Sequence, residues 1–297
     1  MLAANSRSVA AFMRRFGMRL GAARFVAGES LERCVSAARG LNEKGLWASA
    51  TLLGEHVTDA RQAARVVEDN EAIMRRLADE RLSANVGIKL SSVALAIDEV
   101  LAIEYADRLA RRAADLGMDL RIDMEESTTV DATLRAYRAL RVRGRDNLEI
   151  ALQAYLRRTQ RDLRSLIPLH PHVRLVKGAY LEPEDVAYPD KRDVDASYAR
   201  LLDLAIGSEA YVAVATHDDR LIDRAIQLAD GRGVGKDRFE FQMLYGIRER
   251  RQVELAGRGF RVLISVPFGP DWYPYLMRRL AERPANLLFF LANFFRR

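Results

Sequence analysis

The sequence is poor in cysteine and has no long apolar run. Cys34 is the only cysteine among 297 residues, so neither an intrachain disulfide nor a cysteine-based metal site can form, and a reducing, cytoplasmic compartment fits. No run of about 18 apolar residues occurs, so we expect no membrane-spanning helix. The sequence also has no G-x-G-x-x-G after a strand and no P-loop, so the two common nucleotide-binding fingerprints are missing.

Linker-like segments rich in proline, glycine and serine are absent as well, which favours one domain over residues 1–297. With 49% hydrophobic and 30% charged residues, the chain can bury a sizeable core. Its formal net charge of +6 favours anionic partners in general. That charge does not choose among nucleic acid, a membrane surface and an acidic substrate.

The two ends of the chain have unusual compositions. Residues 1–28 hold five arginines and no acid, which is typical of an amphipathic organellar transit peptide. An N-terminal helix with Phe12, Phe16 and Leu20 partly buried is the competing interpretation, and we favour it. Residues 287–297 read L-L-F-F-L-A-N-F-F-R-R, an apolar segment that could dock on the protein, pair two subunits or touch a membrane surface.

Apolar segments alternate with helical ones from Ser30 onward. Ser30 is expected to cap a first helix, and the alternation after it is typical of a parallel β/α sheet. The expected strands are residues 46–53, 85–90, 119–124, 148–153, 173–177, 210–216, 238–242 and 260–266. The expected helices between them are residues 59–82, 97–116, 130–141, 158–166, 195–204, 220–228 and 249–256.

Eight strands in a chain of this length indicate an α/β protein with a (βα)8 TIM barrel rather than a doubly wound sheet. Residues 1–45 would form extra N-terminal helices, and residues 46–297 would form the barrel and a C-terminal helix. The spacing between the first two strands is longer than the others, which suggests an added helix there.

Charged and polar residues finish nearly every expected strand, and the carboxyl ends of barrel strands are where barrel active sites lie. Lys89, Asp123, Gln153 and Arg174 fall within or directly at apolar runs, where an unpaired charge is expensive to bury. A shared pocket for a charged, planar ligand would supply their partners. The segment 173–180, V-R-L-V-K-G-A-Y, combines a short buried strand with cations and a glycine at its end.

Two other interpretations of these residues stay open. Asp123 and the two glutamates that follow could hold a divalent metal, although His217 is the only histidine expected at a strand end, since His170 and His172 are expected in a loop. The Arg-Arg pair in the last expected helix, with two nearby tyrosines, could contact nucleic acid or lie on a solvated helix face. We favour neither a metal site nor a nucleic-acid partner.

Ordered motifs along the chain carry a resemblance to a known family. They are F-V-A-G-E-S, L-L-G-E at 52–55, I-K-L at 88–90, R-I-D-M-E-E-S at 121–127, L-Q-A-Y-L-R-R-T at 152–159, V-R-L-V-K-G-A-Y, A-T-H-D at 215–218, F-E-F-Q-M-L-Y-G at 239–246 and V-P-F-G-P-D-W-Y-P-Y. In these motifs the chain resembles the bacterial single-function proline dehydrogenases. These are flavoenzymes that oxidise L-proline to pyrroline-5-carboxylate. The resemblance implies a distorted (βα)8 barrel, FAD as cofactor, and hydride transfer from proline to flavin N5.

The resemblance also implies roles for residues that would surround the substrate. Lys89, Arg278 and Arg279 would hold the substrate carboxylate, which suits the strength of charge-assisted hydrogen bonds. Asp123 would lie beside the substrate and orient the site. Glu55 would pair with Arg278 as a gate over the bound substrate.

The resemblance further implies which residues wall the substrate and contact the flavin. Leu244 and Tyr275 would wall the proline ring, and Arg174 would donate toward flavin N5, where negative charge develops as hydride arrives. The other residues implied to contact FAD are Met124, Gln153, Leu175, Lys177, Gly178, Ala179, Thr216 and His217.

One residue departs from the family pattern. Many members carry tyrosine at the position of Ser265, where the side chain packs against the substrate ring. Serine is smaller and can form a hydrogen bond, so we predict room for a ring hydroxyl and better oxidation of hydroxyproline than in tyrosine-bearing relatives. The family passes its electrons to a membrane quinone, so peripheral contact at the inner membrane face is expected of this cytoplasmic protein.

Overall fold

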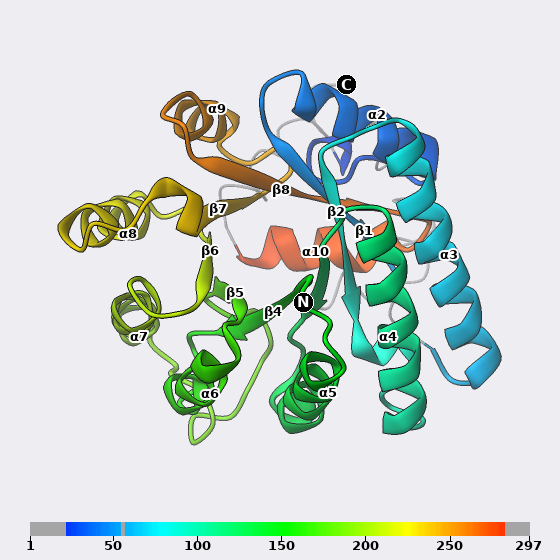
Figure 1. Ribbon diagram of the computed structural model, residues 1–297, viewed down its shortest axis with the longest axis horizontal. Coiled ribbons are helices and arrows are strands. Elements are labelled where there is room, and N and C mark those ends of the chain that lie inside the picture. Colours follow the sequence, from blue (N-terminus) through cyan, green and yellow to red (C-terminus); the bar gives the residue numbers. More distant parts are fainter. Residues whose placement is uncertain (1–21, 55–56, 283–297) are drawn as a thin grey trace.

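The strands form a closed barrel. The computed structural model describes residues 22–54 and 57–277 with their side chains, and the backbone of residues 278–282. Each strand pairs in parallel with the next strand of the chain, and β8 pairs with β1 to close the barrel (Figure 1). The strands are β1 (Trp47–Leu52), β2 (Ala84–Lys89), β3 (Leu120–Asp123), β4 (Leu148–Gln153), β5 (His172–Val176), β6 (Tyr211–Ala215), β7 (Phe239–Leu244) and β8 (Arg261–Phe268).

Helices surround the barrel, one after each strand from β1 to β7 (Figure 1). The α-helices are α2 (Leu31–Asn42), α3 (Ala60–Asp79), α4 (Glu99–Asp115), α5 (Val130–Val142), α6 (Thr159–Leu166), α7 (Lys191–Ala205), α8 (Asp219–Gly231), α9 (Glu249–Gly257) and α10 (Trp272–Glu282). Short 3-10 helices are η1 (Ala22–Arg24), η2 (Leu90–Val93), η3 (Ser127–Thr129), η4 (Ile167–Leu169) and η5 (Lys236–Arg238).

The predicted (βα)8 fold is therefore confirmed, with all eight predicted strands in place. Ser30 caps α2 as expected, since its hydroxyl accepts a hydrogen bond from the backbone N–H of Arg33. The added helix expected between the first two strands is wrong for the residues that the structure describes. That connection holds the single helix α3, whose 20 residues carry a continuous buried stripe from Ala63 to Leu77.

The barrel departs from regular geometry at its seam. α2 packs against β1 and β8, the place that a helix following β8 takes in a regular barrel. α10 follows β8 but packs instead with Leu53, just past the end of β1, which puts it at the carboxyl end of the strands. Figure 1 shows α10 crossing the centre of the ring of strands. Because barrel active sites lie at this end, α10 is positioned to cover one.

A small hydrophobic cluster, separate from the main core, holds α10. It joins Trp272, Tyr273 and Leu276 to the segment around η1, including Phe25 and Val26. The Trp272 indole N–H also donates to the Glu29 carboxylate at 2.8 Å. The position of α10 thus depends on residues almost at the opposite end of the chain.

The two faces of the barrel wall differ in chemistry. Outward side chains such as Val86, Ile122 and Ile150 pack under the helices in the main hydrophobic core. Successive residues of a strand point to opposite faces, and the inward faces of the same strands carry polar or charged side chains such as Lys89, Arg121 and Glu149. The interior is crowded: a Cβ on Gly87 would come within 2.2 Å of Nη2 of Arg121, so glycine makes room for this guanidinium.

Candidate active site at the barrel mouth

Asp123 is the centre of a charged cluster at the carboxyl ends of the strands. It is the register partner of Lys89 on β2, as the predicted shared pocket requires. Its Oδ1 accepts a hydrogen bond from Nε of Arg121 at 2.8 Å and a longer one from Nη1 of Arg174 at 3.4 Å. Three of the four residues singled out from apolar runs, Lys89, Asp123 and Arg174, are thus brought together.

Arg121 is the residue that the sequence interpretation missed. Its side chain is buried inside the barrel, where the guanidinium donates to Ser49 Oγ at 2.7 Å and to Thr51 Oγ1 at 3.0 Å. The signal was available, since Arg121 stands two residues before Asp123 and must share its face of the strand. Arg121 ties β3 to β1 beneath the mouth.

Electrostatics keep Asp123 ionised. Burial alone would raise the pKa of its carboxyl, but the charges of Arg121 and Arg174, the hydrogen bond from Arg121 and the charge of Lys89 outweigh burial and lower the pKa. Asp123 therefore stays an acceptor at neutral pH and is unsuited to donate a proton.

Arg174 is held through two of its three guanidinium nitrogens. Its Nε donates to Oε1 of Gln242 at 2.8 Å, and its Nη1 lies near Asp123. Its Nη2 makes no hydrogen bond with the residues that the structure describes, and the side chain keeps 16% exposure. Burial and the neighbouring Arg121 lower the pKa of Arg174, but a guanidinium stays charged in proteins. A fixed cation with a donor still available can bind an anionic or electron-rich ligand.

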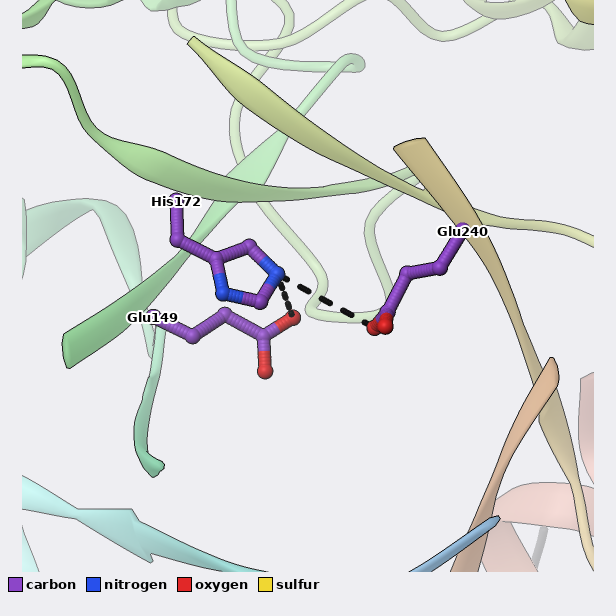
Figure 2. A group of neighbouring side chains, drawn as sticks. All are labelled: Glu149, His172 and Glu240. Atoms are coloured by element: carbon purple, nitrogen blue, oxygen red, sulfur yellow. Dashed lines mark ion pairs between the residues drawn. The ribbon is translucent and has the colours of Figure 1, made fainter. Parts of the chain in front are cut away.

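A second cluster lies next to Arg174, further from the carboxyl ends of the strands and so below the mouth. The Gln242 amide donates to Oε1 of Glu149 at 2.5 Å and to Oε1 of Glu240 at 2.6 Å. Nε2 of His172 lies 3.8 Å and 3.9 Å from the same two oxygens. Figure 2 shows Glu149, His172 and Glu240 converging from β4, β5 and β7. The expectation that His172 lies in a loop is wrong, because β5 begins at this residue and turns it into the barrel.

These three side chains are the one group of possible metal ligands that comes together among the described residues. The Gln242 amide already donates to both carboxylate oxygens that a cation would need. Arg261 adds a guanidinium beside Glu240, with Nε 3.0 Å from Oε2. An amide N–H₂ and a guanidinium repel a metal ion, so the cluster is better described as a hydrogen-bonded ion network. Nor do the glutamates after Asp123 gather around it, since Glu125 accepts hydrogen bonds from Ser91.

Groups predicted to contact a cofactor lie on the rim formed by β4, β5 and β6. The Gln153 amide donates to the carbonyl of Glu125 at 2.8 Å. The Lys177 ammonium donates to Asp195 at 2.5 Å and to Asp218 at 3.0 Å, so two carboxylates fix it. Thr216 is buried next to the end of β6, where its hydroxyl accepts from the Asp218 N–H. His217 accepts the Leu244 N–H through Nε2 at 3.0 Å.

The loop after β5 requires its glycine. Gly178 has φ +115°, and a Cβ there would lie 2.2 Å from the ring of Tyr155. Ala179 beside it is exposed, and Met124 is buried at the end of β3. Leu175 differs from the other predicted contacts, because its side chain belongs to the main hydrophobic core. It could offer a ligand only backbone atoms.

The predicted substrate side of the site is partly described. Leu244 and Ser265 are register partners on β7 and β8, and Ser265 is also paired with the inward-facing Ser49, so both face the barrel interior. Tyr275 is half-buried on α10. Arg278 and Arg279 lie on the same helix, but their side chains are outside the described part of the chain, as is all of Glu55. Residues 1–21 and 287–297 are likewise outside it.

A closed parallel barrel that gathers Lys89, Asp123 and Arg174 at the carboxyl ends of its strands has the arrangement in which enzymes of the (βα)8 class place their active sites. Comparison with known proteins makes this specific: the model of the proline dehydrogenase family matches residues 34–291. The chain belongs to the proline dehydrogenase family.

Individual relatives agree with this placement. Proline dehydrogenase 1 of Bacillus subtilis (strain 168) is 40% identical over 286 residues, which cover 96% of this chain and 94% of the relative. The proline dehydrogenase of Deinococcus radiodurans is 42% identical over 272 residues, covering 90% and 88%. The fold is similar to that of proline utilization A from Bdellovibrio bacteriovorus, with a TM-score of 0.82 at 23% identity over 91% of this chain and 33% of that one. Within the described residues, no helix is long and apolar enough to cross a membrane.

Proposed function

We propose that this enzyme uses FAD to oxidise L-proline to 1-pyrroline-5-carboxylate, the first step of proline breakdown. Membership of the proline dehydrogenase family gives the reaction. The observation that supports its location is Arg174, a half-buried guanidinium inside the barrel that is fixed through Nε and Nη1, while Nη2 makes no hydrogen bond with the described residues. Such a donor suits the flavin edge where negative charge develops.

The residues around Arg174 fit a flavin nucleotide. The rim of β4 to β6 offers an amide at Gln153, an ammonium at Lys177 and a hydroxyl at Thr216. The missing side chain at Gly178 leaves room for the ring of Tyr155, which fixes the path of this loop at the rim. These donors suit the carbonyl and phosphate oxygens of FAD. Bound at this rim, FAD would supply the hydride acceptor of the reaction.

The chain's own groups bind and orient the substrate. Lys89 lies beside Asp123 at the mouth, and we propose that it holds the proline carboxylate together with Arg278 and Arg279. Asp123, kept ionised by Arg121 and Arg174, fixes the two guanidiniums and lies beside the substrate. Proline with a neutral amine would then lose a hydride from C5 and the proton on its nitrogen, which leaves the C=N bond of the product.

α10 would act as the cover of the site. It carries Tyr275 as a wall for the proline ring, with Leu244 on β7 opposite, and it crosses the mouth. We propose that Glu55 pairs with Arg278 to close this cover over the substrate. Glu55→Ala is then expected to weaken proline binding and leave flavin content intact. A Glu55→Ala protein purified without flavin would contradict the assignment of Glu55 to substrate binding rather than to flavin binding.

Hydroxyproline is a second candidate substrate. Ser265 faces the interior next to Leu244 and is only half-buried, so its small side chain leaves space on the wall that faces the substrate. The reduced enzyme is proposed to pass electrons to a membrane quinone through peripheral contact at the inner face of the membrane, which suits the basic net charge.

Steady-state oxidation with a dye as electron acceptor tests the proposal. Wild-type protein loaded with FAD is expected to convert L-proline to 1-pyrroline-5-carboxylate. Lys89→Met removes a charged hydrogen bond worth about 1.5–3 kcal/mol, so it should raise KM for proline by roughly 10- to 100-fold. Arg174→Met should mainly lower kcat. A colourless protein that binds nucleic acid in a salt-sensitive way would contradict the proposal.

A further inference from the structure

Gln242 connects the mouth of the barrel to the charges below it. Its Nε2 donates to Glu149 at 2.5 Å and to Glu240 at 2.6 Å, so both amide hydrogens are used. Its Oε1 must therefore face upward, where it accepts from Nε of Arg174 at 2.8 Å. Reversing the amide would turn its N–H₂ toward a guanidinium and its oxygen toward two carboxylates. The amide orientation, and with it that of Arg174, is set by this pair of carboxylates.

The two carboxylates are not equivalent. Oε2 of Glu240 has Nε of Arg261 at 3.0 Å and the Tyr211 hydroxyl at 3.3 Å. Oε2 of Glu149 has no hydrogen-bond partner within the described part of the chain, although the residue is completely buried. A buried carboxylate with an oxygen that accepts no hydrogen bond is poorly stabilised as an anion. Binding a proton therefore costs little free energy.

Of the two carboxylates that bind Gln242, Glu149 is the one that acts more on Arg174. Its charge is among the main ones that raise the pKa of Arg174, and the charge of Glu240 is not. The groups that face Glu149 are Arg121 and Asp123 on β3, His172 and Arg174 on β5, and Glu240 and Gln242 on β7. Burial outweighs the attraction of Arg121 and Arg174 and raises the pKa of Glu149 to about 7.

We propose that Glu149 is a positioning residue that sets the charge beneath Arg174, and that its protonation tunes how strongly the barrel mouth stabilises a reduced flavin. The inference rests on the proposed function, in which Arg174 faces the flavin. With Glu149 ionised, Arg174 is partly neutralised from below. With Glu149 protonated, the full positive charge of Arg174 faces the ligand and favours added electrons.

The midpoint potential of bound FAD, measured by spectroelectrochemistry from pH 6 to 9, tests this. Reduced flavin itself loses a proton from N1 near neutral pH, so the readout is the difference in potential between variant and wild type at each pH. Glu149→Gln keeps the shape and can still accept from Gln242 through its carbonyl, so it should raise the potential at pH 8.5 and leave it nearly unchanged at pH 6. Glu240→Gln is the matched control, since it contacts the same amide, and it should shift the potential at pH 8.5 by less because its charge is not among those that act most on Arg174.

Two results would overturn the proposal. One is a wild-type protein in which reduction of the flavin near pH 7 leaves the infrared carboxyl bands unchanged, a measurement that does not depend on any variant folding. The other is a Glu149→Gln potential that runs parallel to that of wild type over the whole range. The proposed function fails in a different way, through protein that binds no FAD or whose flavin L-proline does not reduce. KM for proline should stay within about twofold in Glu149→Gln, because Glu149 does not reach the substrate.

Discussion

Replacing Glu149 by glutamine should stabilise the protein, and only at higher pH. Burial raises the pKa of Glu149 from 4.5 to about 7, in spite of the attraction of Arg121 and Arg174 and the hydrogen bond from Gln242. A raised pKa means that the folded protein binds a proton more tightly than the unfolded chain does. Glutamine is neutral at every pH and carries no such penalty.

The pH window and the magnitude follow from that pKa. Below about pH 4.5 the carboxyl is protonated in both states, so it makes no difference to the free energy of unfolding. As pH rises to about 7, the unfolded chain loses the proton before the folded protein does, and wild type becomes less stable relative to the variant. One pKa unit corresponds to about 1.36 kcal/mol, so the difference above pH 7 should approach roughly 3 kcal/mol.

Urea unfolding of both proteins from pH 5 to 8.5 measures this difference directly. The lowered pKa of buried His172 changes stability with pH in the opposite direction, and because His172 lies 3.8 Å from Glu149, its titration is followed separately by NMR in both proteins. Glu68→Gln, on the exposed face of α3, is a control expected to change stability by less than about 0.5 kcal/mol. A difference between wild type and Glu149→Gln that does not change with pH would refute the reasoning.

Three further predictions concern the rim, the cover and the substrate pocket. Gly178→Ala should lower both Tm and flavin content, because it strains a backbone at φ +115° and brings a Cβ within 2.2 Å of Tyr155. Glu29→Gln weakens the charged hydrogen bond from Trp272 that holds α10, so KM for proline should rise several-fold while kcat and flavin content stay unchanged. Ser265→Tyr should lower the ratio of kcat/KM for hydroxyproline to that for proline.

Each of these predictions has a contrary outcome. Full flavin content in Gly178→Ala would show that the loop after β5 does not contact the cofactor. A fall in kcat without a change in KM in Glu29→Gln would show that the position of α10 does not affect substrate binding. An unchanged ratio of specificity constants in Ser265→Tyr would show that residue 265 does not face the substrate ring.

The sequence predicted the barrel well because its strands obey local rules. The strand predicted at 148–153 is β4 as observed, and β7 and β8 run only two residues further, to Leu244 and Phe268, than predicted. Four of the predicted strands also carry a polar or charged residue within or directly at an apolar run, namely Lys89, Asp123, Gln153 and Arg174. This pattern predicts that Lys89, Asp123 and Arg174 lie together at one end of the barrel, because parallel strands of a closed barrel end on the same side.

What was missed depends on register and on distant contacts. The role of Arg121 follows from the pairing of β3 with β2 opposite Gly87, and no local pattern reports that pairing. His172 was placed in a loop because Pro171 precedes it, although a proline can stand directly before a strand. The packing of α10 on the segment near Phe25 joins parts of the chain that no spacing rule connects.

The visible absorption spectrum of the anaerobic, FAD-loaded protein, recorded before and after addition of L-proline, tests the central claim most directly. The account predicts a flavin spectrum that L-proline bleaches in wild type, and bleaching that is much slower in Arg174→Met at saturating proline. Two results would contradict the account. One is a wild-type flavin that stays oxidised after L-proline is added, and the other is a flavin in Arg174→Met that L-proline reduces as fast as in wild type.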